Sequence, residues 1–223
     1  MKLKVIFIVA LLSLFLSSVF AQERFVRPVD EAKKDASFLA FRTKLISAVK
    51  KRDVNFLLSI VDRNIKNGFG GEDGIEKFKK GWKISSRNSE LWKELLAVLN
   101  NGGAFDDKRR TAFYAPYLFT DFPEDIDAFE YQAIFGNNVN LRAQPDINAP
   151  IVASLSYNIV KADFQNAVTS PTNKDEVLWV KVETLGGKKG YVKPEFVRSS
   201  IDYRAGFEKI RGKWMMTFFL AGD

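Results

Sequence analysis

Apolar residues recur every three or four positions through most of residues 36–99, which is the spacing of one face of an α-helix. Asp35 and Asp53 each precede such a stretch, where an aspartate can accept hydrogen bonds from the free amides of a first helical turn. A glycine-rich stretch at 68–74 interrupts the pattern. The spacing therefore predicts a helical domain over residues 22–128. Its four expected helices bury Phe38, Phe41, Leu45, Ala48, Val49, Val54, Leu57, Leu58, Val61, Ile75, Phe78, Trp82, Leu91, Trp92, Leu95, Val98 and Leu99.

After Tyr131 the pattern changes to short β-rich runs separated by Gly, Pro and Asn. Residues 179–182 and 191–192 are two such runs, and the glycine turn at 185–188 between them indicates a β-hairpin. Many short strands with this punctuation favour a closed barrel. We therefore predict a small β-barrel over residues 129–200.

A last pair of β-rich runs, residues 203–210 and 213–220, surrounds a turn at Gly212. An isolated hairpin is only marginally stable in water, and a barrel of the predicted size fills its own interior. We therefore expect the hairpin at 201–223 to pack on the helical domain, with the barrel as an insertion. The predicted fold class is α+β, with an N-terminal helical domain, a β-barrel and a C-terminal β-hairpin. Alternation along the hairpin predicts buried side chains at Phe207, Trp214, Met216 and Phe218.

The motifs between residues 131 and 198 occur in a specific order. They are Val139-Asn140-Leu141-Arg142, Pro145, Pro150-Ile151-Val152, Ile159-Val160, Trp179-Val180-Lys181-Val182, Gly187, Gly190-Tyr191-Val192 and Phe196-Val197. This succession resembles the bacterial SH3 (SH3b) family, which implies an SH3-like barrel. That family commonly recognises cell-wall peptides, so the resemblance implies a peptide or glycan ligand. The candidate ligand-binding residues are Asn140, Arg142, Trp179 and Tyr191, of which Tyr191 is the first choice for contact.

Structural roles are the alternative for two of these residues, because Asn140 could brace a loop and Trp179 could be half core. The sequence also departs from the family pattern. Asn158 stands where a turn glycine is usual, and asparagine tolerates a positive φ better than other non-glycine residues. Tyr191 replaces the commoner tryptophan, and the loop at 164–177 is longer than usual, which makes it a site for specificity or a tolerated insertion.

The C-terminal hairpin has a second, looser likeness. Its run Phe207-x-x-Ile210-x-Gly212-Lys213-Trp214 is similar to the closing hairpin of NTF2-like domains, and the helices around Asp53 are loosely similar to their opening. Few strands are predicted before residue 130, so the curved sheet of that fold is incomplete in the predicted elements.

Residues 1–21 have the pattern of a secretory signal peptide. Lys2 and Lys4 precede an uncharged apolar run at 5–16, and small residues occupy the positions that a signal peptidase reads before Gln22. The run is shorter than the ~20 apolar residues that span a bilayer. We therefore expect a mature protein that begins at Gln22, is periplasmic or secreted, and has no transmembrane anchor.

Composition excludes several chemistries. The chain has no Cys and no His, which removes thiol nucleophiles, Ser-His-Asp catalysis, imidazole zinc sites and disulfides, and we expect no metal and no cofactor. The net charge is +7, but the basic residues are spread out rather than clustered, so no nucleic-acid partner is expected. A segment with acidic and no basic residues, 111–130, connects the helical domain to the barrel. The core depends on 46% hydrophobic residues, with 20 Phe.

Three functions fit these observations. The first is a non-catalytic cell-envelope protein whose barrel binds a peptide or glycan, with peptidoglycan as the leading ligand. The second is a host-interaction or assembly protein that binds a protein partner and uses the barrel as a scaffold. The third is a wall hydrolase that depends on two carboxylates, but Glu90 and Glu94 are neighbours on one predicted helix rather than residues that face each other across a cleft. The sequence predicts no oligomeric state.

Overall fold

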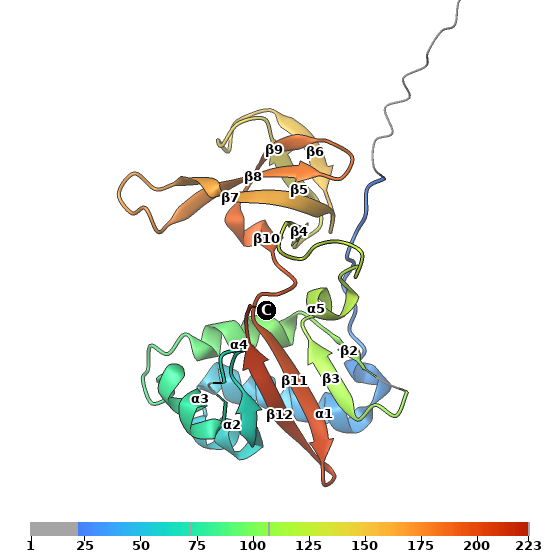
Figure 1. Ribbon diagram of the computed structural model, residues 1–223, viewed down its shortest axis with the longest axis vertical. Coiled ribbons are helices and arrows are strands. Elements are labelled where there is room, and N and C mark those ends of the chain that lie inside the picture. Colours follow the sequence, from blue (N-terminus) through green and yellow to red (C-terminus); the bar gives the residue numbers. More distant parts are fainter. Residues whose placement is uncertain (1–21, 72, 107, 223) are drawn as a thin grey trace, which may run out of the picture.

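The computed structural model describes residues 22–71, 73–106 and 108–222. The predicted signal peptide at residues 1–21 lies outside the described residues. The protein is α+β, and the described residues form helices together with one sheet of five strands and one of seven (Figure 1). We call the five-stranded sheet with its helices the mixed unit, and the seven-stranded sheet, which curls into a half-barrel, the curled sheet.

The first two α-helices of the mixed unit begin at the predicted caps. Asp35 accepts a hydrogen bond from the Phe38 amide at 2.8 Å, and Asp53 accepts one from the Phe56 amide at 2.9 Å. The helical elements are η1 (Ala32–Lys34), α1 (Ala36–Lys51), α2 (Val54–Ile60), α3 (Ile75–Gly81), α4 (Leu91–Asn100) and α5 (Tyr117–Asp121).

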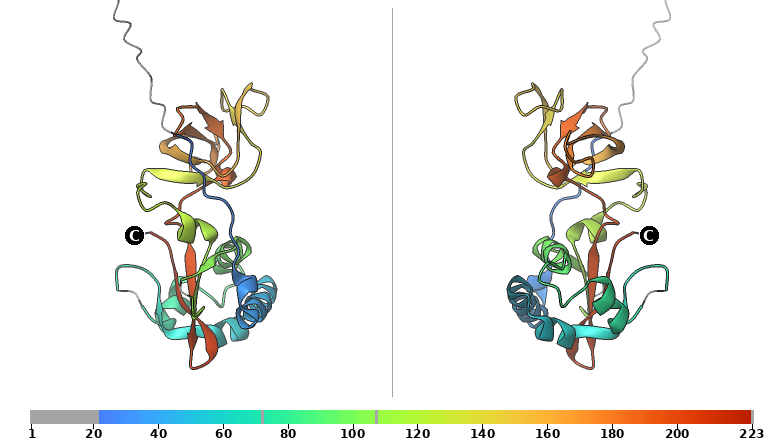
Figure 2. Two further views of the ribbon diagram at one scale, coloured as in Figure 1. Left: turned by 90° about the vertical axis from the view of Figure 1, so that its right-hand side faces the viewer. Right: turned by 90° about the vertical axis from the view of Figure 1, so that its left-hand side faces the viewer.

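The sheet of the mixed unit takes strands from both ends of the chain. Its order is β1 (Val61–Lys66), β12 (Lys213–Leu220), β11 (Arg204–Ile210), β3 (Ala112–Ala115) and β2 (Ala104–Phe105). The C-terminal hairpin β11–β12 is central, parallel to β1 on one side and antiparallel to β3 on the other. Helix α1 covers one face of this sheet, and α4 lies beside it (Figures 1 and 2).

The expectation of an all-helical segment over residues 22–128 was wrong, because this segment also contributes β1, β2 and β3. These strands are short and their partners lie far away in sequence, in β11 and β12, so local periodicity does not reveal them. Val61, expected on the second helix, is the first residue of β1. The sheet is thus completed by pairing between distant segments.

The core of the mixed unit is aromatic. The ring of Phe38 lies 4.1 Å from the ring of Phe113 and 4.9 Å from that of Trp214, between centroids. Phe207, Trp214 and Met216 from the hairpin are buried in this core, against α1 and α4. Burial of such rings gives ~25 cal/mol per Å² of apolar surface, so the hairpin stabilises the helices that it covers.

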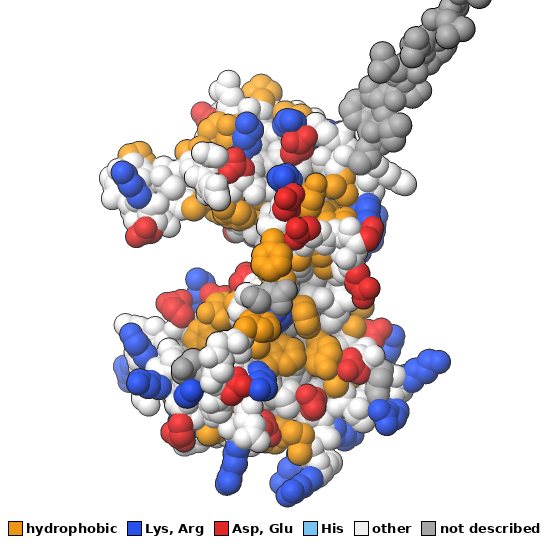
Figure 3. Space-filling view, in the orientation of Figure 1, with side chains coloured by type: hydrophobic (Ala, Val, Ile, Leu, Met, Phe, Trp, Pro, Cys, Tyr) orange, Lys and Arg blue, Asp and Glu red, His pale blue; other side chains and the backbone are white. Residues whose placement is uncertain are grey.

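Phe218 is not on the buried face, contrary to the prediction. Phe207 pairs with Met216 while the neighbouring Gly206 pairs with Phe218, so Thr217 is an extra residue and the alternation shifts. This β-bulge turns Phe218 to the opposite face, and Phe219 is buried instead. On this opposite face the rings of Tyr114 and Phe218 lie 5.6 Å apart. Figure 3 shows hydrophobic side chains gathered on the front of the mixed unit.

The curled sheet is inserted between α5 and β11. Its order is β10 (Val197–Arg198), β4 (Tyr131–Ile134), β7 (Ile159–Thr169), β8 (Val177–Thr184), β9 (Lys189–Val192), β5 (Val139–Arg142) and β6 (Ile151–Leu155), and η2 (Pro194–Phe196) precedes β10. Val139, Leu141, Val160, Val180 and Val192 are among the side chains that fill its interior. The ends of β7 and β8 project from the sheet as an arm (Figure 1).

The turn before β7 differs in detail from the expectation. Tyr157, with φ of 61°, is the residue with left-handed backbone, rather than Asn158. The Asn158 side chain instead accepts a hydrogen bond from the Ser156 amide at 2.8 Å and donates one to Glu23 at 3.1 Å. Asn158 therefore braces the turn through its side chain.

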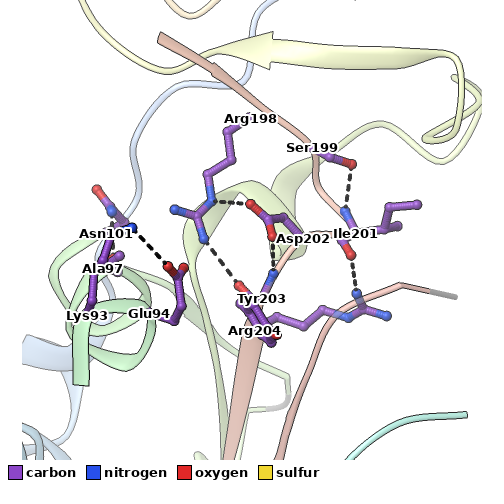
Figure 4. Close-up of polar contacts among 10 residues, drawn as sticks. All are labelled: Lys93, Glu94, Ala97, Asn101, Arg198, Ser199, Ile201, Asp202, Tyr203 and Arg204. Atoms are coloured by element: carbon purple, nitrogen blue, oxygen red, sulfur yellow. Dashed lines mark hydrogen bonds and ion pairs between the residues drawn. The ribbon is translucent and has the colours of Figure 1, made fainter. Parts of the chain in front are cut away.

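A third cluster of buried side chains joins the two units. It contains Val26 from the N-terminal segment, Tyr117 and Leu118 from α5, and Ala133 and Ile159 from the curled sheet. The chain crosses back through a polar link between β10 and β11 (Figure 4). There Arg198 lies 3.6 Å from the Asp202 carboxylate, and Arg204 donates to the Ile201 carbonyl at 2.9 Å.

Candidate binding face of the curled sheet

A row of four side chains crosses the outer face of the curled sheet. Arg142 on β5 pairs with Tyr191 on β9, Tyr191 pairs with Lys181 on β8, and Lys181 pairs with Asp163 on β7. Directly opposed residues of antiparallel strands point to the same side of a sheet. The pairing therefore places Arg142, Tyr191, Lys181 and Asp163 side by side.

Burial identifies this side as the outer one. Val180, Val182 and Val192 alternate with the row and are buried in the interior, at 0%, 1% and 0% exposure. Lys181 is exposed and Tyr191 is half-buried. The alternation that the sequence shows at 179–182 thus orients the lysine toward solvent.

Gly190 permits the close approach that brings Tyr191 beside Arg142. A Cβ atom at Gly190 would lie 2.5 Å from the Arg142 carbonyl oxygen and 2.9 Å from a methyl carbon of Leu141. Position 190 therefore tolerates no side chain, because the closer of these two contacts is with a backbone atom, which cannot move aside easily. A glycine before Tyr191 is therefore a requirement of the β5–β9 pairing.

A groove of about 550 Å³ lies next to this row. Lys161, Asp163, Lys181, Glu183 and Lys189 line it, together with aromatic residues at its margins. Those aromatics are Phe129, at the end of the acidic connector, and Phe164, at the base of the arm, with exposed fractions of 67% and 47%. Exposed rings beside charged side chains form a surface that can hold an apolar side chain and polar groups of one ligand.

Most charges in the groove are already paired. Lys161 lies 3.0 Å from Glu130, whose hydrogen bond raises the pKa of the lysine, and Lys189 lies 3.1 Å from Glu183. Hydrogen bonds from the Asn166 side chain and amide lower the pKa of Asp163, which keeps this carboxyl ionised. Within the described part of the chain, Lys181 has no carboxylate within ion-pair distance. Lys181 is therefore the cation of the row that is available to a ligand.

Two of the predicted ligand-binding residues, Arg142 and Tyr191, are adjacent in this row. Arg142 is partly committed to the fold, because its guanidinium donates to the Ala149 carbonyl at 2.8 Å and so braces the loop after β5. Tyr191 presents its ring between Arg142 and Lys181.

The other two predicted residues lie on the same outer face, each two residues before a member of the row on its own strand: Trp179 before Lys181 on β8, and Asn140 before Arg142 on β5. Trp179 is 6% exposed and the Lys193 ammonium lies 4.3 Å from its ring centroid, so this ring is covered. Asn140 is exposed, but it pairs with Ser154 toward the β6 edge rather than with β9. All four predicted residues therefore share one face of the curled sheet, but only Arg142 and Tyr191 are directly paired, and Trp179 is covered.

The groove itself was not predicted from the sequence. Phe129 was within the acidic connector and Phe164 at the start of the long loop, and no local pattern connects them. Lys181 and Lys189 carried a usable signal, because both stand at outward positions of strands that flank a predicted hairpin turn.

No group of three or more Asp or Glu residues among the described residues has the geometry of a metal site. In the same part of the chain, no helix has the length and apolar character needed to cross a membrane. Neither a scan of protein-family models nor a search of curated protein sequences returned a match to this chain.

Proposed function

We propose that this protein is an exported, non-catalytic cell-envelope protein whose curled sheet is an SH3b-like module that binds a peptide or glycan, with peptidoglycan as the leading ligand. The observation that carries the proposal is the contiguous row Tyr191, Lys181 and Asp163 beside the groove between Phe129 and Phe164.

The order of strands supports an SH3b-like module. The family-like motifs fall on successive elements: Val139–Arg142 is β5, the run at 151–155 is β6, the tryptophan run is in β8 and the Gly-Tyr-Val run is in β9. The glycine turn at 185–188 joins β8 to β9, which pair as an antiparallel hairpin.

The charge pattern supports a zwitterionic peptide rather than a polyanion. Lysines 161, 181 and 189 alternate in the groove with Glu130, Asp163 and Glu183, so the lining has no excess of either sign. A ligand carboxylate would lie at Lys181, a ligand ammonium at Asp163, and an apolar group against Tyr191 or Phe164. Peptides attached to wall glycans carry all three kinds of group.

The absence of histidine and cysteine from the sequence supports a binding function over an acyl-transfer or thiol-dependent enzyme. The N-terminal charge and apolar pattern support export. These two arguments come from the sequence and are independent of the groove.

A co-sedimentation experiment tests the proposal. Mature protein would be mixed with intact murein sacculi and with glycan strands from which an amidase has removed the peptides. We expect binding to the intact sacculi and much less to the stripped glycan. Lys181→Ala should weaken binding about tenfold, the usual size of a lost charge-assisted contact. Lys213→Ala, at the far turn of the C-terminal hairpin, is the matched control and should bind like the wild type.

Two results would contradict the proposal. One is wild-type protein that stays in the supernatant with intact sacculi at low salt. The other is equal binding by Lys181→Ala, Tyr191→Ala and the wild type, with melting temperatures unchanged. Binding to stripped glycan as strong as to sacculi would indicate that the ligand is the sugar rather than the peptide.

A specific observation favours the second candidate, an assembly protein. Strand β6 is an edge of the curled sheet, and Ile151 and Val152 on it are 55% and 47% exposed. An apolar edge strand can pair with a strand of another chain. Val152→Lys should abolish such an association, measured as a shift of molar mass in light scattering.

A further inference from the structure

Three aromatic rings meet at one end of the five-stranded sheet of the mixed unit, near the C-terminus. This end lies away from the groove of the curled sheet. The Trp82 ring lies 5.1 Å from both the Tyr203 and the Phe219 rings, and the Tyr203 and Phe219 rings stack at 5.4 Å. Phe219 is fully buried, whereas Trp82 and Tyr203 are half-buried. Two of the three rings therefore present part of their surface outward.

These outward surfaces form the wall of a pocket of about 670 Å³. Phe78 of α3 is part of its lining and is 1% exposed, so the pocket extends to the core of the mixed unit. The volume is within the range of small-molecule sites, roughly 300–1,000 Å³. We call it the α3 pocket, and its lining residues are Asn67, Lys77, Phe78, Lys80, Gly81, Trp82, Tyr203 and Ala221.

The charged side chains of the α3 pocket are cations. Lys77 and Lys80 both come from α3, and Lys77 donates to the Gly71 carbonyl at 3.3 Å. The Lys80 side chain is exposed, and within the described residues it forms neither an ion pair nor a hydrogen bond. An ammonium with that freedom can turn toward a ligand at little cost.

The carboxylates near the α3 pocket already face other cations. Asp73 accepts a hydrogen bond from Lys66, and this bond, together with the nearby charges of Lys66 and Lys77, lowers the pKa of Asp73. Burial, together with Glu94 and Asp202, raises the pKa of Tyr203, so both of these carboxylates lie near its ring. Each already faces a cation: Glu94 lies 3.7 Å from Lys93, and Asp202 lies 3.6 Å from Arg198 (Figure 4). The phenol of Tyr203 consequently remains neutral and can donate a hydrogen bond to an anion.

We propose that the α3 pocket binds a small organic anion that carries a ring. The ring would pack against the outward surfaces of Trp82 and Tyr203, and the phosphate or carboxylate would lie at Lys80 and Lys77. Aromatic faces hold planar rings and the apolar face of sugars, whereas the lysines supply the charge that a neutral ring lacks. The groove of the curled sheet plays no part in this site, so its failure as a wall-binding face leaves the present proposal standing.

Tryptophan fluorescence provides a direct test. Trp92, Trp179 and Trp214 are 5%, 6% and 6% exposed, whereas Trp82 is half-buried, so quenching by a ligand in the α3 pocket should come mainly from Trp82. The probes are phenyl phosphate and glucose 6-phosphate, with phenol, glucose and inorganic phosphate as analogues that lack one part. We expect at least one of the two ring-bearing phosphates to quench saturably with a Kd below about 1 mM, and the two analogues that each lack one of its parts to bind at least about tenfold more weakly.

Two variants assign the site. Trp82→Phe should remove most of the quenching while calorimetry still detects binding. Lys80→Met should raise the Kd about tenfold, and Lys213→Met, the same change at the distant hairpin turn, should leave it unchanged. Because Lys80 is exposed, its replacement does not threaten folding, which the melting temperature will check.

Each of the following outcomes would overturn the proposal: no saturable quenching by either ring-bearing phosphate, full quenching in Trp82→Phe, wild-type affinity in Lys80→Met, or binding of inorganic phosphate as tight as that of the ring-bearing phosphate. The last outcome would indicate a simple anion site without a role for the rings. Equal binding of phenol and phenyl phosphate would likewise remove the role of the lysines.

Discussion

The ring of Tyr117 in α5 stacks on the ring of Phe135, which follows β4, with centroids 5.8 Å apart and planes inclined by 10°. Tyr117 belongs to the segment before the inserted sheet and Phe135 to the sheet itself, so this pair joins the two units. The guanidinium of Arg198, at the return crossing, lies 5.7 Å from the centroid of the same Phe135 ring. The chain segments that enter and leave the inserted sheet therefore meet at one aromatic side chain.

The burial of Tyr117 predicts a sensitivity to alkaline pH. Burial raises the pKa of Tyr117 to about 12, above the ordinary value of a tyrosine phenol. A raised pKa in the folded state means that the neutral phenol stabilises the fold fully below about pH 10, and that this contribution is lost as pH rises toward 12. Thermal melting from pH 8 to 12 should show a steeper loss for the wild type than for Tyr117→Phe. Parallel curves would contradict the assignment.

The bulge that turns Phe218 to the outer face predicts that Gly206 is intolerant of any side chain. A Cβ atom at Gly206 would lie 2.1 Å from a carbon of the Phe218 ring, so Gly206→Ala forces that ring out of its position. Such overpacking costs about 1–3 kcal/mol. Gly81→Ala is the control, because nothing lies within 4 Å of its added Cβ, and it should be neutral or slightly stabilising. Chemical denaturation measures both, and equal stabilities would disprove the packing argument.

Truncation after Ser200 should unfold the mixed unit. It removes β11 and β12, which lie between β1 and β3 and supply Phe207, Trp214 and Met216 to the core. The curled sheet has its own buried interior and is expected to persist. Hydrogen exchange by mass spectrometry would show loss of protection in α1 and α4 with protection retained in β7 and β8. Retained protection in α1 would mean that the hairpin is dispensable.

Asp35→Ala should lower the free energy of unfolding by about 1 kcal/mol, a typical loss for an N-cap. Its carboxylate accepts from the Ser37 hydroxyl at 2.6 Å and the Phe38 amide at 2.8 Å, and these bonds lower its pKa. A lowered pKa means that the contribution is present above the unfolded value and is lost as pH falls. The difference between wild type and variant in urea unfolding should therefore shrink between pH 7 and pH 2. A difference that stays constant with pH would argue against the cap.

Local patterns predicted much of the chain. The caps Asp35 and Asp53, the apolar stripes of α1 and α4, and the hairpin β8–β9 depend on residues near one another in sequence, where hydrogen bonding and periodicity act over a few positions. These features need no knowledge of the rest of the molecule.

The features that were predicted wrongly or not at all depend on residues that are distant in sequence. Strand β1 exists because it pairs with β12, some 150 residues later, and the face of Phe218 depends on a bulge that an alternation rule does not contain. The groove of the curled sheet joins Phe129 to Phe164 across β4 and β7, and the α3 pocket joins Trp82 to Tyr203 across the whole insertion. Only tertiary packing brings such residues together.

The sequence by itself determined where helices begin, which strands alternate and which chemistries lack their residues, because these depend on local backbone hydrogen bonds and on composition. The tertiary structure decided which strands share a sheet, which aromatic rings are buried and which lysines lie beside exposed rings. These depend on long-range pairing and on the burial of apolar surface, which favours whichever distant partner covers the most of it.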